Sequence, residues 1–416
     1  MTHTELPVPE AVSGTGTGPQ AATPERLAAR AAFAAEMDAR TVEHLRDGGS
    51  LKWTLFPDRI GAFVAEADFG TAPAVRDAVR EAVAAERFGY LTPVTSDAMA
   101  GAFSAWASGR YGWSVDPDRV RPVGDVMAAF RATVRHLTAP GSTIVLPTPA
   151  YMPFLTVPGT LDRRVVEVPL TRDGDRLVHD PDALRRALGD RGGLLVLCNP
   201  HNPTGRVLDR AELLGIADVV EATGARVFAD EIHAPLVYAG RRHVPYASLD
   251  ARTAAHTVTA TSASKAWNVP GLKCAQIVLT SEQDVRTWAD VGEEYEHGAA
   301  MLGVLASTAA WSHGADWLDS AVDYLDGNRL LLADLLAERL PGVRYTPPEG
   351  TYLAWLDCRG LGLGDRPGRH FGQHAGVALT DGPACGRAGN GFVRYTLATP
   401  RPVLRATVDR LAAALP

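Results

Sequence analysis

The sequence predicts an α/β fold with a mostly parallel central sheet. Short runs of β-branched and aliphatic residues recur along the chain, and they are continuously apolar rather than alternating, which is typical of parallel strands covered on both faces. Helical patterns lie between several of these runs, and this strand–helix–strand order favours a parallel sheet. The length of 416 residues indicates two domains rather than one.

The first expected elements lie in the N-terminal part of the chain. Residues 1–23 are rich in Thr, Gly, Pro and Ala, so we expect a disordered leader. This segment has neither the charged nor the apolar region of a signal peptide, which favours a cytoplasmic protein. One helix is predicted over 24–46, followed by a polar break over 47–50, and a second helix over 74–85.

Six apolar runs of four or five residues are predicted to be buried strands. They cover residues 143–146, 164–168, 194–197, 226–229, 256–260 and 276–279. Helical patterns separate several of them, including one over 210–221. We therefore expect a large α/β domain over residues 74–312.

The C-terminal third is more mixed. A long helix is predicted over 315–338, strands over 351–356 and 391–396, and a closing helix over 402–413. This order favours a smaller α+β domain. We expect that domain to combine residues 24–73 with residues 313–416.

The composition argues against several classes of protein. A formal net charge of −7 argues against nucleic acid or an acidic membrane surface as the main partner. No apolar stretch approaches the ~20 residues that a membrane span requires. The four cysteines show no ligand spacing, so neither a metal site nor a disulfide framework is expected. Cys198 and Cys274 are predicted to be buried free thiols.

Lysine is rare in this chain, and its positions are informative. Only three of the 41 basic residues are lysine, and two of them, Lys265 and Lys273, lie in one short segment. A guanidinium cannot form a Schiff base, whereas a lysine amine can once burial or a nearby cation lowers its pKa. Lys265 is therefore a candidate for covalent catalysis; the alternative is an ordinary surface lysine.

Three consecutive predicted strands end in polar residues of different kinds. The amide of Asn202 follows the first, the carboxylate of Asp230 the second, and Lys265 the third. Because ligands bind at the carboxyl ends of parallel strands, we expect these side chains to converge. Taken singly, the carboxylate could be a helix N-cap, and His233, close to Asp230, could be a packed core histidine.

This combination matches the needs of pyridoxal 5′-phosphate. A carboxylate pairs with the pyridine nitrogen and keeps the ring an electron sink, while the amide binds the phenolic oxygen and the lysine forms the Schiff base. Nearby hydroxyls and a second cation would hold the phosphate.

At these motifs the chain resembles a known family, the fold type I pyridoxal-phosphate enzymes of the aminotransferase class I/II group, from about residue 52 to the C-terminus. The motifs are Asn-Pro-His-Asn-Pro-Thr-Gly, Asp-Glu-Ile-His and Ser-Ala-Ser-Lys. Within the group, the chain is most similar to the MalY/PatB-type cystathionine β-lyases. That similarity lies in segments 50–53, 67–69, 151–154, 230–233 and 348–352. The resemblance implies the transferase-like fold of these enzymes.

The resemblance also implies roles for individual residues. Lys265 would form the Schiff base and later remove the substrate Cα proton, Asp230 would pair with the ring nitrogen, and Asn202 with the phenolic oxygen. Tyr151 would stack on the ring as a further catalytic residue; its alternative is core packing beside Phe154.

The cofactor phosphate would be held by side chains and by N–H groups at the start of a helix running to about residue 137. The implied contacts are Ser262, Ser264, Lys273, Asp125, Val126 and Met127, and His233 belongs to the cofactor-binding set. Most family members have glycine where Asp125 falls, so we expect this carboxylate to point away or to cap the helix.

Two further residues would complete the site. Arg394, with Asn202, would bind the substrate carboxylate bidentately; its alternative is a structural ion pair. Tyr90 resembles the tyrosine that reaches the phosphate of a neighbouring subunit, which implies a homodimer with a shared active site. Its alternative is an ordinary loop aromatic.

The implied reaction is β-elimination on a cysteine S-conjugate resembling cystathionine, which gives thiol, pyruvate and ammonia. The same residues could support an aminotransferase. More distant alternatives are a decarboxylating or oxidatively deaminating enzyme and a non-enzymatic regulatory binding protein. The sequence does not identify which small amino acid is the substrate.

Overall fold

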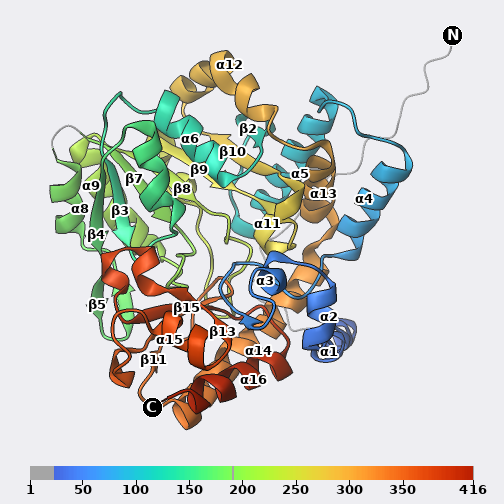
Figure 1. The fold of residues 1–416 in the computed structure, drawn as a ribbon. Helices are drawn as coiled ribbons and strands as arrows, with labels where there is room; N and C mark the ends of the chain where they lie inside the picture. Colours follow the sequence, from blue (N-terminus) through green and yellow to red (C-terminus); the bar gives the residue numbers. More distant parts are fainter. Residues whose placement is uncertain (1–22, 190–191, 416) are drawn as a thin grey trace.

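The computed structural model describes residues 23–189 and 192–415, so all but the last residue of the expected leader lies outside the described residues. A seven-stranded sheet has the order β2-β10-β9-β8-β7-β3-β4 (Figure 1). Its strands are β2 (Val120–Val123), β3 (Ile144–Thr148), β4 (Val165–Pro169), β7 (Leu194–Cys198), β8 (Arg226–Asp230), β9 (Thr257–Thr261) and β10 (Ala275–Leu279). Strand β10 runs opposite to the other six strands. The predicted α/β fold is confirmed.

All six predicted strands are present, with bounds that shift by at most two residues. Two expectations were wrong at the edges of the sheet. Strand β2 was missed because its sequence, Val-Arg-Pro-Val, is short and contains Pro122, which an edge strand tolerates. Strand β4 was expected to be buried, but as the opposite edge strand it is mostly half-buried, and only Val168 is fully so.

Helices cover both faces of the sheet, which explains the continuously apolar runs. In β3, Ile144 and Leu146 face one core with α6 (Val126–His136) and α12 (Glu282–Glu296). Val145 between them faces the other core, with α8 (Pro181–Leu188) and α9 (Arg210–Thr223). Alternate residues of one strand are therefore both buried, as in doubly covered parallel sheets.

The N-terminal helix differs from its prediction. Two helices, α1 (Pro24–Asp38) and α2 (Val42–Asp47), replace the single helix expected over 24–46. The hydroxyl of Thr41 accepts from the N–H of His44 at 3.2 Å and so caps a new helix, because a threonine side chain competes with helical backbone bonding. The predicted polar break follows, and then comes α3 (Leu51–Thr54).

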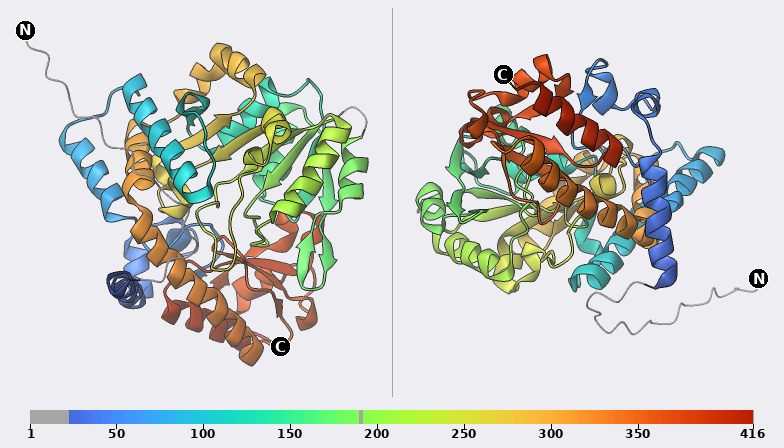
Figure 2. Two further views of the ribbon diagram at one scale, coloured as in Figure 1. Left: turned by 180° about the vertical axis from the view of Figure 1, so that it is seen from behind. Right: turned by 90° about the horizontal axis from the view of Figure 1, so that it is seen from below.

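The C-terminal part contains a second, antiparallel sheet of order β11-β12-β15-β14. Its strands are β11 (Arg344–Tyr345), β12 (Leu353–Asp357), β14 (Thr380–Asp381) and β15 (Phe392–Thr396). Helix α14 (Ala315–Arg339) packs against α1 and α16 (Arg401–Ala413), so both ends of the described chain meet in this part (Figures 1 and 2). A short parallel pair, β1 (Ile60–Gly61) with β13 (Val377–Ala378), also joins these segments.

The remaining helices and strands belong to the connections within and between these sheets. The helices are α4 (Pro73–Ala84), α5 (Pro93–Tyr111), α7 (Pro153–Thr156), α10 (Ala251–His256), α11 (Ala263–Ala266), α13 (Met301–His313) and α15 (Pro367–His374), and the strands are β5 (Thr171–Asp173) and β6 (Arg176–Val178). Across the described ranges, none of the helices has the length and hydropathy needed to cross a bilayer.

Candidate active site

A cavity of about 210 Å³ lies at the carboxyl ends of β7, β8 and β9. Asn202, Asp230 and Lys265 all line it, so the structure brings together the amide, the carboxylate and the amine. The other predicted residues in its wall are Asp125, Val126, Met127, Tyr151, His233, Ser262, Ser264 and Lys273. Convergence follows from the parallel order of three neighbouring strands.

Lys265 lies in α11, directly after β9. The N–H of Ser264 donates to the hydroxyl oxygen of Ser262 at 3.0 Å, and this contact caps the short helix. The Lys265 ammonium donates to the Ala65 carbonyl at 2.8 Å. Burial, reinforced by the positive charge of Arg394, lowers the pKa of Lys265 to about 8. At pH 7 roughly a tenth of the amine is therefore neutral, far more than for an ordinary lysine.

Asp230 ends β8 and is buried. Its Oδ1 accepts from the Ile232 N–H at 3.2 Å, and the Cys198 thiol lies 3.8 Å from Oδ2. Burial raises the pKa of Asp230 to about 6. Over residues 23–189 and 192–415, no side-chain cation lies within 4.0 Å of this carboxylate. A protonated ring nitrogen would supply the missing positive charge.

Asp125 and Lys273 form the opposite end of the cavity. The Asp125 carboxylate accepts from the Ala128 N–H at 2.8 Å and caps α6, as expected from its departure from the family. The same carboxylate contacts the Lys273 ammonium at 2.6 Å. Burial alone would raise the pKa of Asp125, but the hydrogen bonds from Lys273 and Ala128 and the charge of Lys273 outweigh it and lower the pKa. First-turn N–H groups at Val126 and Met127 have no intrahelical acceptor.

Ser262 differs from the simple phosphate contact that the resemblance implies. Its hydroxyl donates to the Cys274 carbonyl at 2.6 Å while its oxygen accepts from Ser264. Its proton is thus committed to the backbone, and the side chain shapes the turn that carries Lys265. Ser264 lines the cavity as well.

Tyr151 and His233 each combine packing with exposure to the cavity. The Tyr151 ring packs edge-on against Phe154 at 5.7 Å and also lines the cavity. Packing beside Phe154 is therefore compatible with stacking on a cofactor ring. His233 packs edge-on against Tyr352 at 5.8 Å. Burial, aided by the charges of Lys265 and Arg394, lowers the pKa of His233 to about 3, so its imidazole is neutral.

Arg394 in β15 has only 3% of its surface exposed. Its guanidinium donates to Asn202 Oδ1 at 3.2 Å and to the Phe63 carbonyl at 2.8 Å. Within the described part of the chain, no carboxylate lies within 4.0 Å of it, which contradicts the ion-pair alternative. An unneutralised buried guanidinium is costly, and a bound carboxylate would relieve that cost.

Tyr90 is not part of this site in the single chain. It lies in the loop between α4 and α5, and 92% of its surface is exposed. The cavity wall described above does not include it.

Sequence reasoning missed the role of the segment over residues 62–68, of which Ala65 lines the cavity. The Ala65 carbonyl accepts from Lys265 and, at 3.0 Å, from the Tyr352 hydroxyl. The Asn268 side chain bonds both the N–H and the carbonyl of Ala67, at 3.0 and 2.9 Å. Only the similarity of segments 50–53 and 67–69 to the lyase branch pointed towards this region.

A buried ion pair anchors the same segment. The Lys52 ammonium contacts Asp68 at 2.7 Å and donates to the Ala398 carbonyl at 3.0 Å. The indole N–H of Trp53 donates to the other Asp68 oxygen at 2.8 Å. The segment therefore fixes the Ala65 carbonyl opposite Lys265.

Pyridoxal phosphate fits this set of groups. An uncompensated buried carboxylate, a lysine of lowered pKa and a helix N-terminus line one cavity, as the ring nitrogen, the aldehyde and the phosphate require. The side chain of Asp125 adds negative charge at the phosphate end, but Lys273 offsets it.

Comparisons with known proteins agree with this site. The profile of the family named aminotransferase class I and II matches residues 60–415. The cystathionine beta-lyase of Corynebacterium glutamicum is 36% identical over 90% of this chain and 99% of its own length. The cystathionine beta-lyase PatB of Bacillus subtilis is 32% identical, over 88% and 96%.

A solved structure gives the same result. Cystalysin from Treponema denticola, which contains a pyridoxal 5′-phosphate cofactor, superposes with a TM-score of 0.83 at 27% identity, over 89% of this chain and 96% of that one. The resemblance to the MalY/PatB branch is therefore confirmed, and the chain belongs to the aminotransferase class I and II family.

Proposed function

We propose that this protein is a pyridoxal-phosphate-dependent C–S β-lyase. It would convert a cysteine S-conjugate such as cystathionine into a thiol, pyruvate and ammonia. One observation carries the proposal: a buried guanidinium without a carboxylate partner, Arg394, lies beside a cavity that contains a lysine of lowered pKa. Relatives named cystathionine beta-lyase favour elimination over other fates of an amino acid.

Five residues would hold the cofactor. Lys265 would bind its aldehyde carbon covalently, Asp230 its ring nitrogen and Asn202 its phenolic oxygen. Tyr151 would pack on the ring, and Lys273 would attract the phosphate together with the α6 N–H groups. Bound pyridoxal phosphate supplies an electron sink for the charge that develops at the substrate Cα.

The substrate would be oriented by Arg394. Its guanidinium would make two parallel hydrogen bonds to the α-carboxylate. Because the Phe63 carbonyl and Asn202 already fix the guanidinium, little side-chain entropy is lost on binding. This contact would set the Cα–H bond relative to Lys265.

Lys265 would act as the base. The neutral Nζ takes the Cα proton, and its lowered pKa keeps a useful fraction of the amine unprotonated near neutral pH. The Ala65 carbonyl, 2.8 Å from Nζ, would hold the amine when it is not bonded to the cofactor. The sulfur group would then leave Cβ with the electrons of the C–S bond and take up a proton to give the thiol. Water would hydrolyse the remaining three-carbon fragment to pyruvate and ammonia.

We also propose a homodimer in which Tyr90 reaches the phosphate of the partner subunit. The exposed loop around Tyr90 carries Phe88, which is also well exposed. Large exposed aromatic side chains commonly mark an interface. The interface would thus complete both active sites.

An aminotransferase would use the same residues, so the reaction products must distinguish it from a lyase. Protein reconstituted with pyridoxal phosphate is incubated with cystathionine and with a simple S-alkyl-cysteine, and thiol, pyruvate and the amine form of the cofactor are measured. We expect one pyruvate for each thiol and at least ~100-fold lower kcat in Lys265→Ala. Formation of the amine form without thiol from both substrates would refute the lyase.

A further inference from the structure

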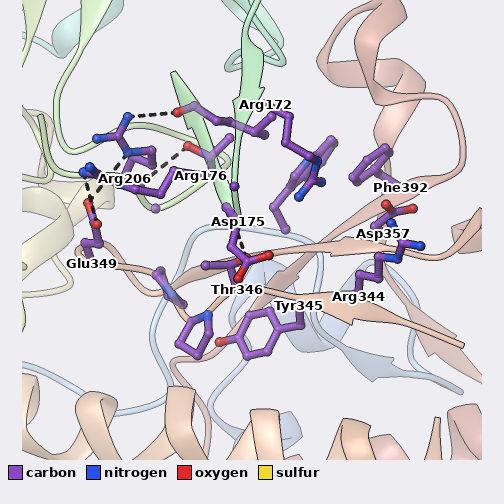
Figure 3. Close-up of a pocket in the computed structure, with 17 residues that line it drawn as sticks. Arg172, Asp175, Arg176, Arg206, Arg344, Tyr345, Thr346, Glu349, Asp357 and Phe392 are labelled. Atoms are coloured by element: carbon purple, nitrogen blue, oxygen red, sulfur yellow. Dashed lines mark hydrogen bonds and ion pairs between the residues drawn. The ribbon is translucent and has the colours of Figure 1, made fainter. Parts of the chain in front are cut away.

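A second cavity, of about 540 Å³, lies between the β5–β6 hairpin and the C-terminal sheet. It shares no lining residue with the active-site cavity. Figure 3 shows Arg176, Arg206 and Glu349 on one side and Arg344, Asp357 and Phe392 on the other. Its volume is in the range of small-molecule sites, about 300–1,000 Å³.

Four arginines line this cavity, and their charge is only partly balanced. Arg172 and Arg344 are exposed, and in the described part of the chain neither lies within 4.0 Å of a carboxylate. Arg206 is 6% exposed and pairs with Glu212 at 2.7 Å, and Arg176 lies 3.4 Å from Glu349. The buried Nε atoms of both arginines have no hydrogen-bond partner among the described residues.

Two of the carboxylates in the wall are already engaged by arginines or by backbone groups. Glu349 accepts from the Val207 N–H at 2.9 Å and contacts Arg241 at 2.7 Å and Arg176 at 3.4 Å. Asp357 is held by two hydrogen bonds from Arg359, at 2.8 and 2.7 Å. Asp175, at the exposed hairpin turn, is the third. Among the described residues, the positive charge that no carboxylate within 4.0 Å balances is therefore that of Arg172 and Arg344, in contrast with the net charge of −7 for the chain.

Much of the remaining wall is apolar. Trp355 and Phe392 stack on each other at 5.2 Å with an interplanar angle of 10°, and each is only 8% exposed. Tyr345, Pro347 and Pro348 also line the cavity. The ring edges of Trp355 and Phe392, with Tyr345 and Pro347, form an apolar surface on which a planar group can pack. The cavity thus presents guanidinium groups and a surface for a ring in one space.

We propose that this cavity binds a phosphate monoester that carries a planar ring system, such as a nucleoside monophosphate. Arg172 and Arg344 would each donate paired hydrogen bonds to the phosphate, a geometry that guanidinium and phosphate share. The ring would pack against the apolar wall around Trp355. Because no lining residue belongs to the active site, the ligand would bind while the cofactor site is filled.

The test uses the holoenzyme, so that the cofactor phosphate site is already occupied. Calorimetric titration with adenosine monophosphate, inorganic phosphate and adenosine measures the contribution of each half of the probe. We expect adenosine monophosphate to bind with a Kd below about 1 mM and each half alone to bind more weakly. Binding should weaken at least ~tenfold in Arg172→Gln/Arg344→Gln.

A control double variant, Arg164→Gln/Arg405→Gln, removes the same charge from exposed positions that do not line the cavity. It should bind adenosine monophosphate as the unaltered protein does. Equal weakening in both variants would reduce the effect to overall charge and overturn the proposal, as would no binding of adenosine monophosphate. Binding is measured directly, so the result is independent of lyase activity.

Discussion

At the scale of single residues, burial gives the site its chemistry. Burial lowers the pKa of Lys265 and raises that of Asp230. Burial also removes water from the Arg394 guanidinium, which has no carboxylate within 4.0 Å among the described residues. Each of these groups is unfavourable alone, and each would be stabilised by a different part of one cofactor–substrate complex. Strained electrostatics of this kind are characteristic of functional sites.

Replacing Arg394 by Gln should impair substrate binding without unfolding the protein. Loss of a buried bidentate contact to a carboxylate should cost about 2–4 kcal/mol, or roughly 30- to 1,000-fold in kcat/KM. Steady-state kinetics with cystathionine measure the effect, and cofactor absorbance checks that the site is intact. Arg405→Gln, on the exposed side of α16, is the matched control. Unchanged kcat/KM in Arg394→Gln would refute the assigned role.

The pH dependence of turnover should reflect Lys265. Its pKa is lowered to about 8 from the usual value, so the neutral base is scarce below that pH and predominates above it. The rate of Cα proton removal should therefore rise as the pH increases through about 8 and then level off. The measurement is the pH profile of kcat with protiated and Cα-deuterated substrate. A rate that falls over this range would exclude the amine as the base.

At the scale of elements, α3 and the segment over residues 62–68 act as one support. Lys52 and Trp53 both hold Asp68, and Asn268 holds Ala67. These contacts place the Ala65 carbonyl against Lys265 although 200 residues separate the two. The wall of the active site thus depends on a buried ion pair outside the cavity.

Lys52→Met should destabilise the protein strongly. It leaves the Asp68 carboxylate buried without its cation, which costs about 3–5 kcal/mol. Equilibrium unfolding in urea measures this loss, and Lys52→Met/Asp68→Asn should recover part of it. Arg80→Met breaks an exposed pair with Asp77 and should cost less than about 1 kcal/mol. Equal losses in the buried and exposed cases would contradict the anchoring role.

At the scale of the whole molecule, the proposed dimer makes a prediction about mixed subunits. Lys265→Ala and Tyr90→Ala should each be impaired alone. If each site takes Lys265 from one chain and Tyr90 from its partner, random mixing after dissociation should restore about a quarter of the sites. Lyase activity of the mixture against its separate components measures this. No recovery, with mixed dimers demonstrated by a tag, would refute a shared site.

The pairing of β1 with β13 and the packing of α1 on α14 join the N-terminal and C-terminal segments. The expected domain boundaries remain a prediction. Strand β2 could not be predicted because four residues that include Pro122 carry almost no pattern.

The sequence by itself determined the α/β class, six strands of the seven-stranded sheet and the meeting of Asn202, Asp230 and Lys265, because these follow from local periodicity and from the shared direction of parallel strands. Only the tertiary structure decided that β10 runs antiparallel, that the Ala65 carbonyl holds Lys265 and that Arg394 has no carboxylate partner in the described part. Backbone carbonyls have no sequence signature, and the partners of a buried charge depend on contacts between residues hundreds of positions apart. Local patterns therefore placed the reactive groups, and long-range packing set their electrostatic environment.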